Sequence, residues 1–228
     1  MGEGLFSRYR RLLVFDTETT GLSPAQAEII EFAAAVLEPQ GVTREYDELI
    51  SLSPGRHIPP NIQALTGITD KELLARGIPR AKLCEDLAEL LGGEDTLLLA
   101  YNAHFDLCFL YYTLAREGNP ALLKGKDKLD LLTVYRDRRP YPHRLASAIE
   151  AYGLQGQVQN SHRAIDDVLA TVAVLRAMEA EREDLIHYVN LFGYNAKYGL
   201  GSKPIASVTY RPQGYEPGRP LYEKELIK

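Results

Sequence analysis

The sequence predicts a mixed α/β fold with five strands, and three observations support that prediction. Three apolar runs separated by short turns fill residues 11–52. Apolar residues at helical spacing then recur in several later segments. Two further short apolar runs, at 96–100 and 127–134, lie between these helical segments, so the later strands require crossover connections through helices.

The first half of the predicted sheet is an antiparallel meander. Residues 11–16 form a short apolar run that ends in an acid, which is typical of a buried strand. Turn residues at 21–24 end this run. Strands at 28–38 and 44–52 follow, joined by a turn at 39–41, and consecutive strands with short turns favour antiparallel pairing.

The second half alternates helices and strands. Leu83, Leu87 and Leu90 are spaced as on one face of a helix, and Gly92-Gly93 ends this pattern. The predicted elements, in order, are a loop at 53–60, short helices after Pro60 and from Thr69, a helix at 80–91, a strand at 96–100, a helix at 104–116, a strand at 127–134, and helices at 143–152 and 162–182.

Composition places the chain among single-domain proteins with an appended segment. The 228 residues are 45% hydrophobic, which is enough for one sizeable core. The net charge of −5 argues against tight, non-specific duplex binding, because such binding depends on many Lys and Arg contacts to phosphates. We expect a cytoplasmic protein with no membrane contact: the N-terminus lacks the apolar run of a signal peptide, no segment is apolar for long enough to span a bilayer, and Cys84 and Cys108 form no CxxC pair.

The domain organisation changes near residue 193. Residues 1–192 are predicted to form the main domain, and residues 193–228 a tail rich in Tyr, Gly and Pro. The tail holds six basic residues against three acids, so its net charge is +3 while that of the remainder is −8. Aromatic and basic residues together can stack bases and hold phosphates, but the favoured interpretation is a strap whose tyrosines pack on the domain. These tyrosines are Tyr194, Tyr198, Tyr210, Tyr215 and Tyr222.

Three short segments carry residues suited to metal or proton chemistry. Asp16 and Glu18 are two residues apart at the end of a strand, so their carboxylates share a face and need a countercharge such as a divalent cation. Asp106 lies in the first turn of one predicted helix, and His162 and Asp167 lie at the start of another. Histidine is the side chain best suited to accept a proton near neutral pH.

Taken alone, each segment has an ordinary explanation, namely a solvated strand end, an acid that favours the helix dipole, or a polar helix start. Together they supply four acids and one histidine. The first two segments lie where ligand sites of α/β proteins form, at a strand end and at the helix start that follows a strand. The set of four acids and one histidine matches two-metal phosphodiester hydrolysis, in which oxygen ligands hold Mg²⁺ or Mn²⁺ ions about 4 Å apart.

The same segments are longer motifs that occur in a fixed order along the chain. They read Phe15-Asp16-Thr17-Glu18-Thr19-Thr20-Gly21-Leu22, Asn102-Ala103-His104-Phe105-Asp106 and His162-Arg163-Ala164-Ile165-Asp166-Asp167. These motifs resemble the three exonuclease motifs of the DEDDh family, which includes the proofreading epsilon subunit of bacterial DNA polymerase III, the exonuclease domain of polymerase C, and ribonuclease T. The resemblance covers about residues 10–182. Tyr101 stands where the family often has His, at a position that is not a metal ligand in the family pattern.

The resemblance implies a ribonuclease-H-like fold, α/β in class, with a five-stranded mixed sheet flanked by helices. The main domain would then be an exonuclease domain. The resemblance also implies two divalent cations, Mg²⁺ or Mn²⁺, as cofactors. Their ligands would be Asp16, Glu18, Asp106 and Asp167, and His162 would be the general base, so these five residues would form the catalytic set.

Further implications concern the substrate. Thr17 and the segment Leu65-Thr66-Gly67-Ile68 would contact the terminal nucleotide. The expected function is metal-dependent 3′→5′ exonuclease activity that releases nucleoside 5′-monophosphates from single-stranded DNA ends, with a polymerase as a candidate partner. The alternatives are an exoribonuclease that trims RNA 3′ ends and, from another functional class, a non-catalytic nucleic-acid-binding module.

Two adjacent acids compete for the last metal position. Helical geometry slightly favours Asp166, because it follows His162 by four residues and would share its face. The family spacing of five residues favours Asp167, and we adopt it because His162 can lie before the regular helix begins. The apolar stripe that includes Ile165 and Val168 predicts that both acids lie off the core face, so burial is not expected to separate them.

Overall fold

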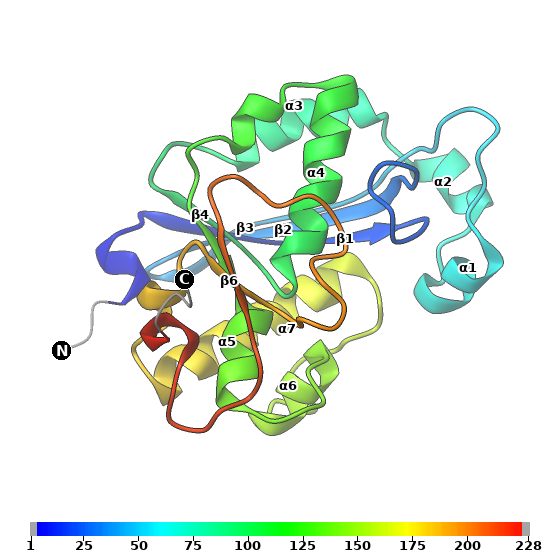
Figure 1. Cartoon of the computed structure of the whole chain (residues 1–228). Helices are drawn as coiled ribbons and strands as arrows, with labels where there is room; N and C mark the ends of the chain where they lie inside the picture. Colours follow the sequence, from blue (N-terminus) through cyan, green and yellow to red (C-terminus); the bar gives the residue numbers. More distant parts are fainter. Residues whose placement is uncertain (1–3, 225–228) are drawn as a thin grey trace.

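The centre of the molecule is one mixed β-sheet, seen in a computed structural model that describes residues 4–224 (Figure 1). Its strands are β1 (Arg11–Thr19), β2 (Ile29–Glu38), β3 (Gly41–Leu49), β4 (Thr96–Ala100) and β5 (Lys128–Asp130). The strand order is β3-β2-β1-β4-β5. β2 is antiparallel to both β1 and β3, whereas β4 runs parallel to β1 and β5 runs parallel to β4. The predicted meander and the predicted five-stranded mixed sheet are both confirmed.

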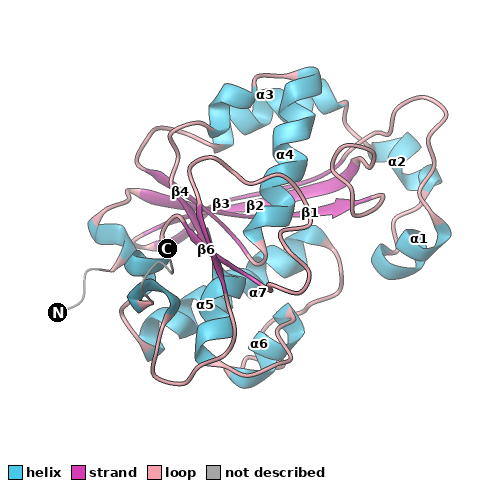
Figure 2. Ribbon diagram, viewed as in Figure 1, coloured by secondary structure: helices cyan, strands magenta, loops and turns pink. Residues whose placement is uncertain are grey.

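Helices cover both faces of this sheet (Figure 2). Successive side chains of a strand point to opposite faces, so Leu13 and Phe15 of β1 belong to one half of the core and Leu12 and Val14 to the other. Burial on both sides explains why β1 reads as a continuous apolar run. The helices are α3 (Arg80–Leu90) and α4 (Ala103–Glu117) on the first face, and α5 (Leu131–Arg138), α6 (Leu145–Ala151) and α7 (Ala164–Glu181) on the second. Apart from α5, they lie within a few residues of the predicted segments.

A small helical lobe lies beyond the far end of β1 (Figure 1). It consists of α1 (Pro60–Thr66) and α2 (Asp70–Arg76), which begin where the sequence predicts short helices. The Thr69 hydroxyl caps α2 by accepting a hydrogen bond from a backbone N–H of its first turn. Ile68 and Leu73 are buried in a separate small core between this lobe and the sheet.

One predicted strand is wrong over most of its length. The sequence predicts a strand at 127–134, but β5 ends at Asp130 and α5 begins at the next residue. The Asp130 carboxylate accepts hydrogen bonds from the backbone N–H groups of Leu132 and Thr133, which is the arrangement of a helix N-cap. A short apolar run fits a buried strand and a buried helix start equally well, so the hydrophobic pattern alone does not separate them.

The segment after α7 folds back onto the domain. A single helical turn, η3 (Leu185–Tyr188), precedes β6 (Leu191–Tyr194), which pairs in parallel with β7 (Thr209–Pro212). β6 therefore begins before residue 193, where the composition changes. Phe192 on β6 and Tyr210 on β7 pack against the half of the core beneath α3 and α4. Two other single turns, η1 (Leu5–Ser7) and η2 (Pro120–Leu123), precede β1 and β5.

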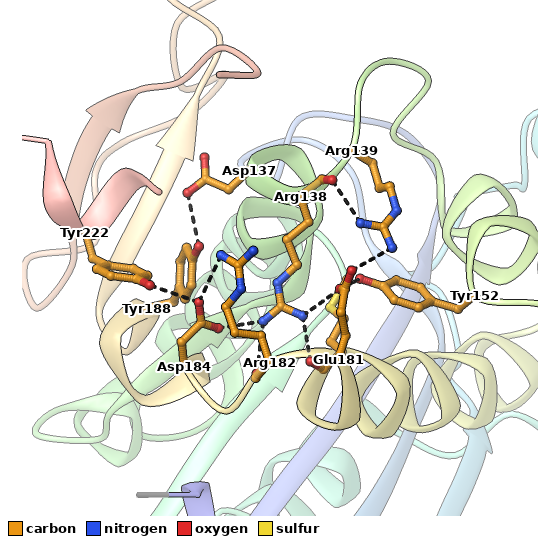
Figure 3. A network of polar contacts seen from close by, with 10 residues as sticks. Asp137, Arg138, Arg139, Tyr152, Glu181, Arg182, Asp184, Tyr188 and Tyr222 are labelled. Carbon is orange, nitrogen blue, oxygen red and sulfur yellow. Dashed lines mark hydrogen bonds and ion pairs between the residues drawn. The ribbon is translucent and has the colours of Figure 1, made fainter. Parts of the chain in front are cut away.

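The final turn, η4 (Leu221–Glu223), is held by a polar network (Figure 3). The Tyr222 hydroxyl donates a hydrogen bond to Asp184 at 2.9 Å, and Arg138 pairs with the other oxygen of Asp184 at 2.6 Å. The Arg138 side chain is only 1% exposed, and removing one partner of such a buried pair typically costs about 3–5 kcal/mol. Part of the tail is therefore built into the fold as a strap, whereas Tyr198 and Tyr215 remain exposed.

Both cysteines lie in the helical layer on one face of the sheet. Cys84 on α3 and Cys108 on α4 are buried free thiols. Burial raises the thiol pKa of both residues, so neither is activated as a nucleophile. Within residues 4–224, none of the helices combines the length and apolar character needed to cross a bilayer.

Candidate active site

β1 brings the first two acids to the end of the sheet. Asp16 and Glu18 lie near its carboxyl end and share one face of the strand because they are two residues apart. Both are partly exposed, in contrast to the fully buried apolar residues that precede them. Between them, Thr17 points to the opposite face, toward α4. The strand thus ends in two parallel carboxylates with a hydroxyl group on the other side.

Asp106 reaches the same place from the first turn of α4. Its side chain is 3% exposed, and its Oδ1 accepts hydrogen bonds from the Thr17 backbone N–H at 3.0 Å and the Thr17 hydroxyl at 2.7 Å. The resemblance implies that Thr17 contacts a terminal nucleotide; in the structure its hydroxyl and backbone N–H hold Asp106 against β1. Thr17 therefore acts on the site as a positioning residue.

His162 and Asp167 approach from the opposite layer, at the start of α7. His162 lies two residues before the helix in the left-handed region, with φ of 58°. Asp167 is buried in the first turn of α7, and its Oδ1 accepts a hydrogen bond from Asn160 at 2.7 Å. One ligand atom each from Glu18, His162 and Asp167 lie within 4.8 Å of one another. The irregular backbone before α7 is what allows a histidine five residues before the acid to join it.

The acids of this cluster repel one another. Burial and then the charges of Asp106 and Asp167 raise the pKa of Asp16 well above its usual range. Burial, Asp167 and Glu31 raise the pKa of Glu18 to about 8. Burial likewise raises the pKa of Asp106 to about 7, against the opposing hydrogen bonds from β1. Asp167 shifts in the same direction, again mainly by burial. A cation placed among these groups would relieve both effects.

Comparison with known proteins establishes the family. The RNase_T family model, which describes an exonuclease, matches residues 13–175. The chain belongs to this exonuclease family. All five residues of the expected catalytic set lie within the matched range. Together with the motifs, the match makes the chain a DEDDh-type exonuclease.

Two relatives show how much of each protein this exonuclease chain spans. The epsilon subunit of DNA polymerase III from Treponema pallidum (strain Nichols) is 32% identical over 169 residues, which are 73% of this chain and 75% of that protein. The PolC-type DNA polymerase III of Streptococcus sanguinis (strain SK36) is 31% identical over 163 residues, which are 72% of this chain but 11% of that protein. The chain is therefore comparable in length to the first relative and spans about a tenth of the second.

Solved structures confirm the expected ribonuclease-H-like fold. A structure of E. coli exonuclease I in complex with a dT13 oligonucleotide superposes with a TM-score of 0.70 and 25% sequence identity. The similarity covers 78% of this chain and 43% of that protein, so the chain spans less than half of exonuclease I.

The residues expected to contact a terminal nucleotide differ in their exposure. Thr66 and Ile68 are 4% and 0% exposed. The Thr66 hydroxyl donates a hydrogen bond to the Ile62 carbonyl and accepts one from the Ile68 N–H, which closes the end of α1. Leu65, with a side chain that is 49% exposed, is the exposed member of this segment.

A cavity of about 490 Å³ lies beside the end of β1, and the sequence did not predict it. Leu22, which is 86% exposed, lines this cavity.

Two residues that support the exonuclease site were also missed. Glu31 on β2 is fully buried opposite Glu18, and it accepts hydrogen bonds from the Arg163 side chain at 2.8 Å and the Ala164 N–H at 2.8 Å. These contacts anchor the start of α7 to the sheet. Asn160, which holds Asp167, precedes the third motif. A lone acid within the apolar run of β2 is the signal that identifies Glu31.

We expect the metal-free exonuclease to lose thermal stability as pH rises from about 5 to about 8. Between these values the unfolded chain releases protons from carboxyls of ordinary pKa, whereas the folded chain still holds them on Glu18 and Asp106. The folded state binds more protons, so the free energy of unfolding falls as pH rises. Mg²⁺ should raise the melting temperature most at the upper end of this range, measured by fluorimetry with and without chelator.

Glu18→Gln is the matched variant for this measurement. It removes one titrating group without changing the size of the side chain, so its melting temperature should fall less steeply with pH than that of the parent. Identical pH slopes for the two proteins, together with no stabilisation by Mg²⁺ at pH 8, would show that the acid cluster does not form a cation site.

Proposed function

We propose that this chain is a metal-dependent 3′→5′ exonuclease that releases nucleoside 5′-monophosphates from single-stranded DNA ends. The observation that carries the proposal is the meeting of four carboxyl groups and one histidine at the carboxyl end of β1. One relative is named as the epsilon subunit of DNA polymerase III, and the exonuclease I structure holds a DNA oligonucleotide. Both favour DNA over RNA as the substrate, and the first favours a polymerase as partner.

The residues present fit a pair of Mg²⁺ or Mn²⁺ ions. Hard divalent cations prefer carboxylate oxygens. The four acids keep raised pKa values even though Arg163 lowers that of Glu18 and His162 lowers that of Asp167. When bound, such ions supply Lewis-acid activation of water and stabilise charge on the leaving oxygen. The residues that would hold them are Asp16, Glu18, Asp106 and Asp167.

His162 would remove the proton from the attacking water. It is exposed, so it can pass that proton on to solvent, as a general base must do between turnovers. Asn160 holds the Asp167 carboxylate and Thr17 holds that of Asp106. Hydrogen bonds of this kind fix the orientation of metal ligands. Both positioning residues are therefore part of the proposed machinery.

Parallel digestion of labelled substrates tests the proposal. With Mn²⁺ or Mg²⁺, single-stranded DNA labelled at its 5′ end should shorten progressively from its 3′ end and yield 5′-mononucleotides, faster than matched RNA, mismatched duplex or structured RNA. Excess EDTA should abolish the reaction, because it removes the divalent cations that the clustered acids would hold. Faster digestion of RNA would make the chain an exoribonuclease, and no digestion of any substrate would support a non-catalytic binding module.

A further inference from the structure

A cavity of about 170 Å³ lies between the start of α4, the start of α5 and the segment 192–210. We call it the tail pocket. Its tail side lies outside residues 13–175, so the match to the exonuclease family assigns it no role. The lining includes Asn102, His104, Asp130 and Arg136 of the domain, and Tyr194 and Tyr198 of the tail.

The tail side of the pocket is fixed to α4 by hydrogen bonds. The two ring nitrogens of His104 lie 2.6 Å from the Tyr210 hydroxyl and 2.6 Å from the Ser202 hydroxyl. A neutral imidazole has one donor and one acceptor nitrogen, which suits two hydroxyl partners. On the other side, Arg136 donates to the Gly193 carbonyl at 3.3 Å. Figure 1 shows the segment, in orange, crossing the start of α4.

The charge in the pocket is suited to a phosphate. Arg136 forms no ion pair with any acid in residues 4–224. The one acid in the lining, Asp130, accepts hydrogen bonds from four backbone N–H groups, two of them at the start of α4 and two at the start of α5. Its negative charge is therefore already compensated. Among residues 4–224, Arg136 is therefore a cation without an anionic partner.

The aromatic part of the pocket is suited to a base. Tyr198 is 74% exposed, and the Lys197 ammonium lies 5.3 Å from its ring centroid. An exposed ring with a cation nearby is typical of surfaces that stack bases of single strands. An apolar cavity of about 150 Å³ accommodates one benzene ring, so the volume of the tail pocket suits one base-sized ring.

The tail pocket and the acids lie along the same edge of the sheet. β1, β4 and β5 are parallel, so the ends that carry Glu18, Asn102 and Asp130 meet at that edge. Neighbouring strands are about 4.8 Å apart, so the end of β5 is about 10 Å from the end of β1. A stacked strand advances about 3.4 Å per nucleotide. A strand whose last phosphate sits at the acids therefore reaches the pocket with a nucleotide a few positions away.

We propose that the tail pocket binds a nucleotide of the substrate strand upstream of the one being removed. Arg136 would contact its phosphate, and Tyr198 would stack on its base. The proposal rests on the proposed exonuclease function, because in 3′→5′ digestion every neighbour of the terminal nucleotide lies upstream. The tail would thus extend the grip of the catalytic domain along the strand.

Tyr198→Ala in the full chain tests the pocket, and Tyr215→Ala is the control from the same tail, because Tyr215 is exposed but lies outside the pocket. We expect Tyr198→Ala to raise KM for a single-stranded oligothymidylate about 10-fold with little change in kcat, since the stacked base is lost. Arg136→Met should make the salt dependence of KM shallower by about 0.7 in logarithmic slope, the value for one phosphate contact on a single strand. Melting temperatures would confirm that each variant is folded.

A second substrate separates the pocket from the proposed function. The p-nitrophenyl ester of thymidine 5′-monophosphate has no upstream nucleotide, so the parent and Tyr198→Ala should hydrolyse it equally well. If the parent hydrolyses neither substrate, the exonuclease function fails. If the parent hydrolyses both and Tyr198→Ala matches Tyr215→Ala on the oligonucleotide, the function stands and the upstream site is rejected. Equal loss on both substrates would place the terminal nucleotide in the pocket and also overturn the proposal. Anisotropy of a labelled oligonucleotide, measured in a hydrolysis-deficient Asp167→Asn background, should show the same affinity loss without turnover.

Discussion

Asp167→Asn should lower kcat by about 10³-fold, whereas Asp166→Asn should leave it within about threefold of the parent. A metal ligand contributes to several kcal/mol of charge stabilisation in the transition state, and about 1.4 kcal/mol corresponds to a factor of ten. The amide of asparagine keeps the shape of the carboxylate but loses its charge. Weaker binding of Mn²⁺, measured by calorimetry, should accompany the loss of activity in the first variant alone.

The surroundings of the two acids explain the expected difference. Asp167 is 7% exposed, accepts a hydrogen bond from Asn160, and has an oxygen within 4.8 Å of ligand atoms on Glu18 and His162. Asp166 is partly exposed, and its carboxylate accepts a hydrogen bond from the Ser161 hydroxyl. The sequence-based expectation that burial does not separate these acids is wrong, because α7 turns Asp167 inward against β1.

Thermal melting provides the control for this pair. The pKa of Asp167 is raised by burial, so its ionised form is unfavourable in the folded chain. Without metal, Asp167→Asn should therefore melt at or above the temperature of the parent, and its loss of activity cannot be attributed to unfolding. If Asp167→Asn kept the kcat of the parent and Asp166→Asn lost it, the metal position would have been assigned to the wrong acid.

The fold was predictable where the hydrophobic pattern and the turn residues agree. The strand at 96–100 matches β4 because five apolar or β-branched positions stand between Gly-rich and polar segments. The pattern failed at 127–134, where Asp130 ends a strand and caps a helix within one apolar run. The sequence did not decide how the tail packs for a related reason: the packing of Tyr210 and Leu221 depends on distant surfaces that no local pattern encodes.

The candidate site was predictable at the level of residue types but not of contacts. The sequence places Asp16 at a strand end and Asp106 at a helix start, and the topology of an α/β sheet brings strand ends and the following helix starts to the same edge. The roles of Thr17 and Glu31 come from hydrogen bonds between segments far apart in sequence. Ile68, which the resemblance implies as a substrate contact, is buried in the small core beneath α2, and the motif alone does not indicate this burial.

The backbone at His162 determines which substitution tests its role. With φ of 58°, this residue occupies the left-handed region, where most side chains are strained and Asn is tolerated better than Ala. His162→Asn therefore removes the basic ring with less disturbance of the start of α7 than His162→Ala. The exposed position of His162 also means that its removal leaves no cavity in the core.

His162→Asn should lower kcat by about 10²–10⁴-fold, the usual contribution of a general base, while the affinity for Mn²⁺ and the KM for single-stranded DNA stay close to those of the parent. Single-turnover kinetics at saturating Mn²⁺ measure the chemical step directly. The ring of His162 also lies among the atoms that could ligate a cation with Glu18 and Asp167, so the two roles must be separated. If excess Mn²⁺ restores kcat in the variant, His162 is a metal ligand. Added metal can compensate for weakened metal binding, but it cannot replace a base that accepts the proton of the attacking water.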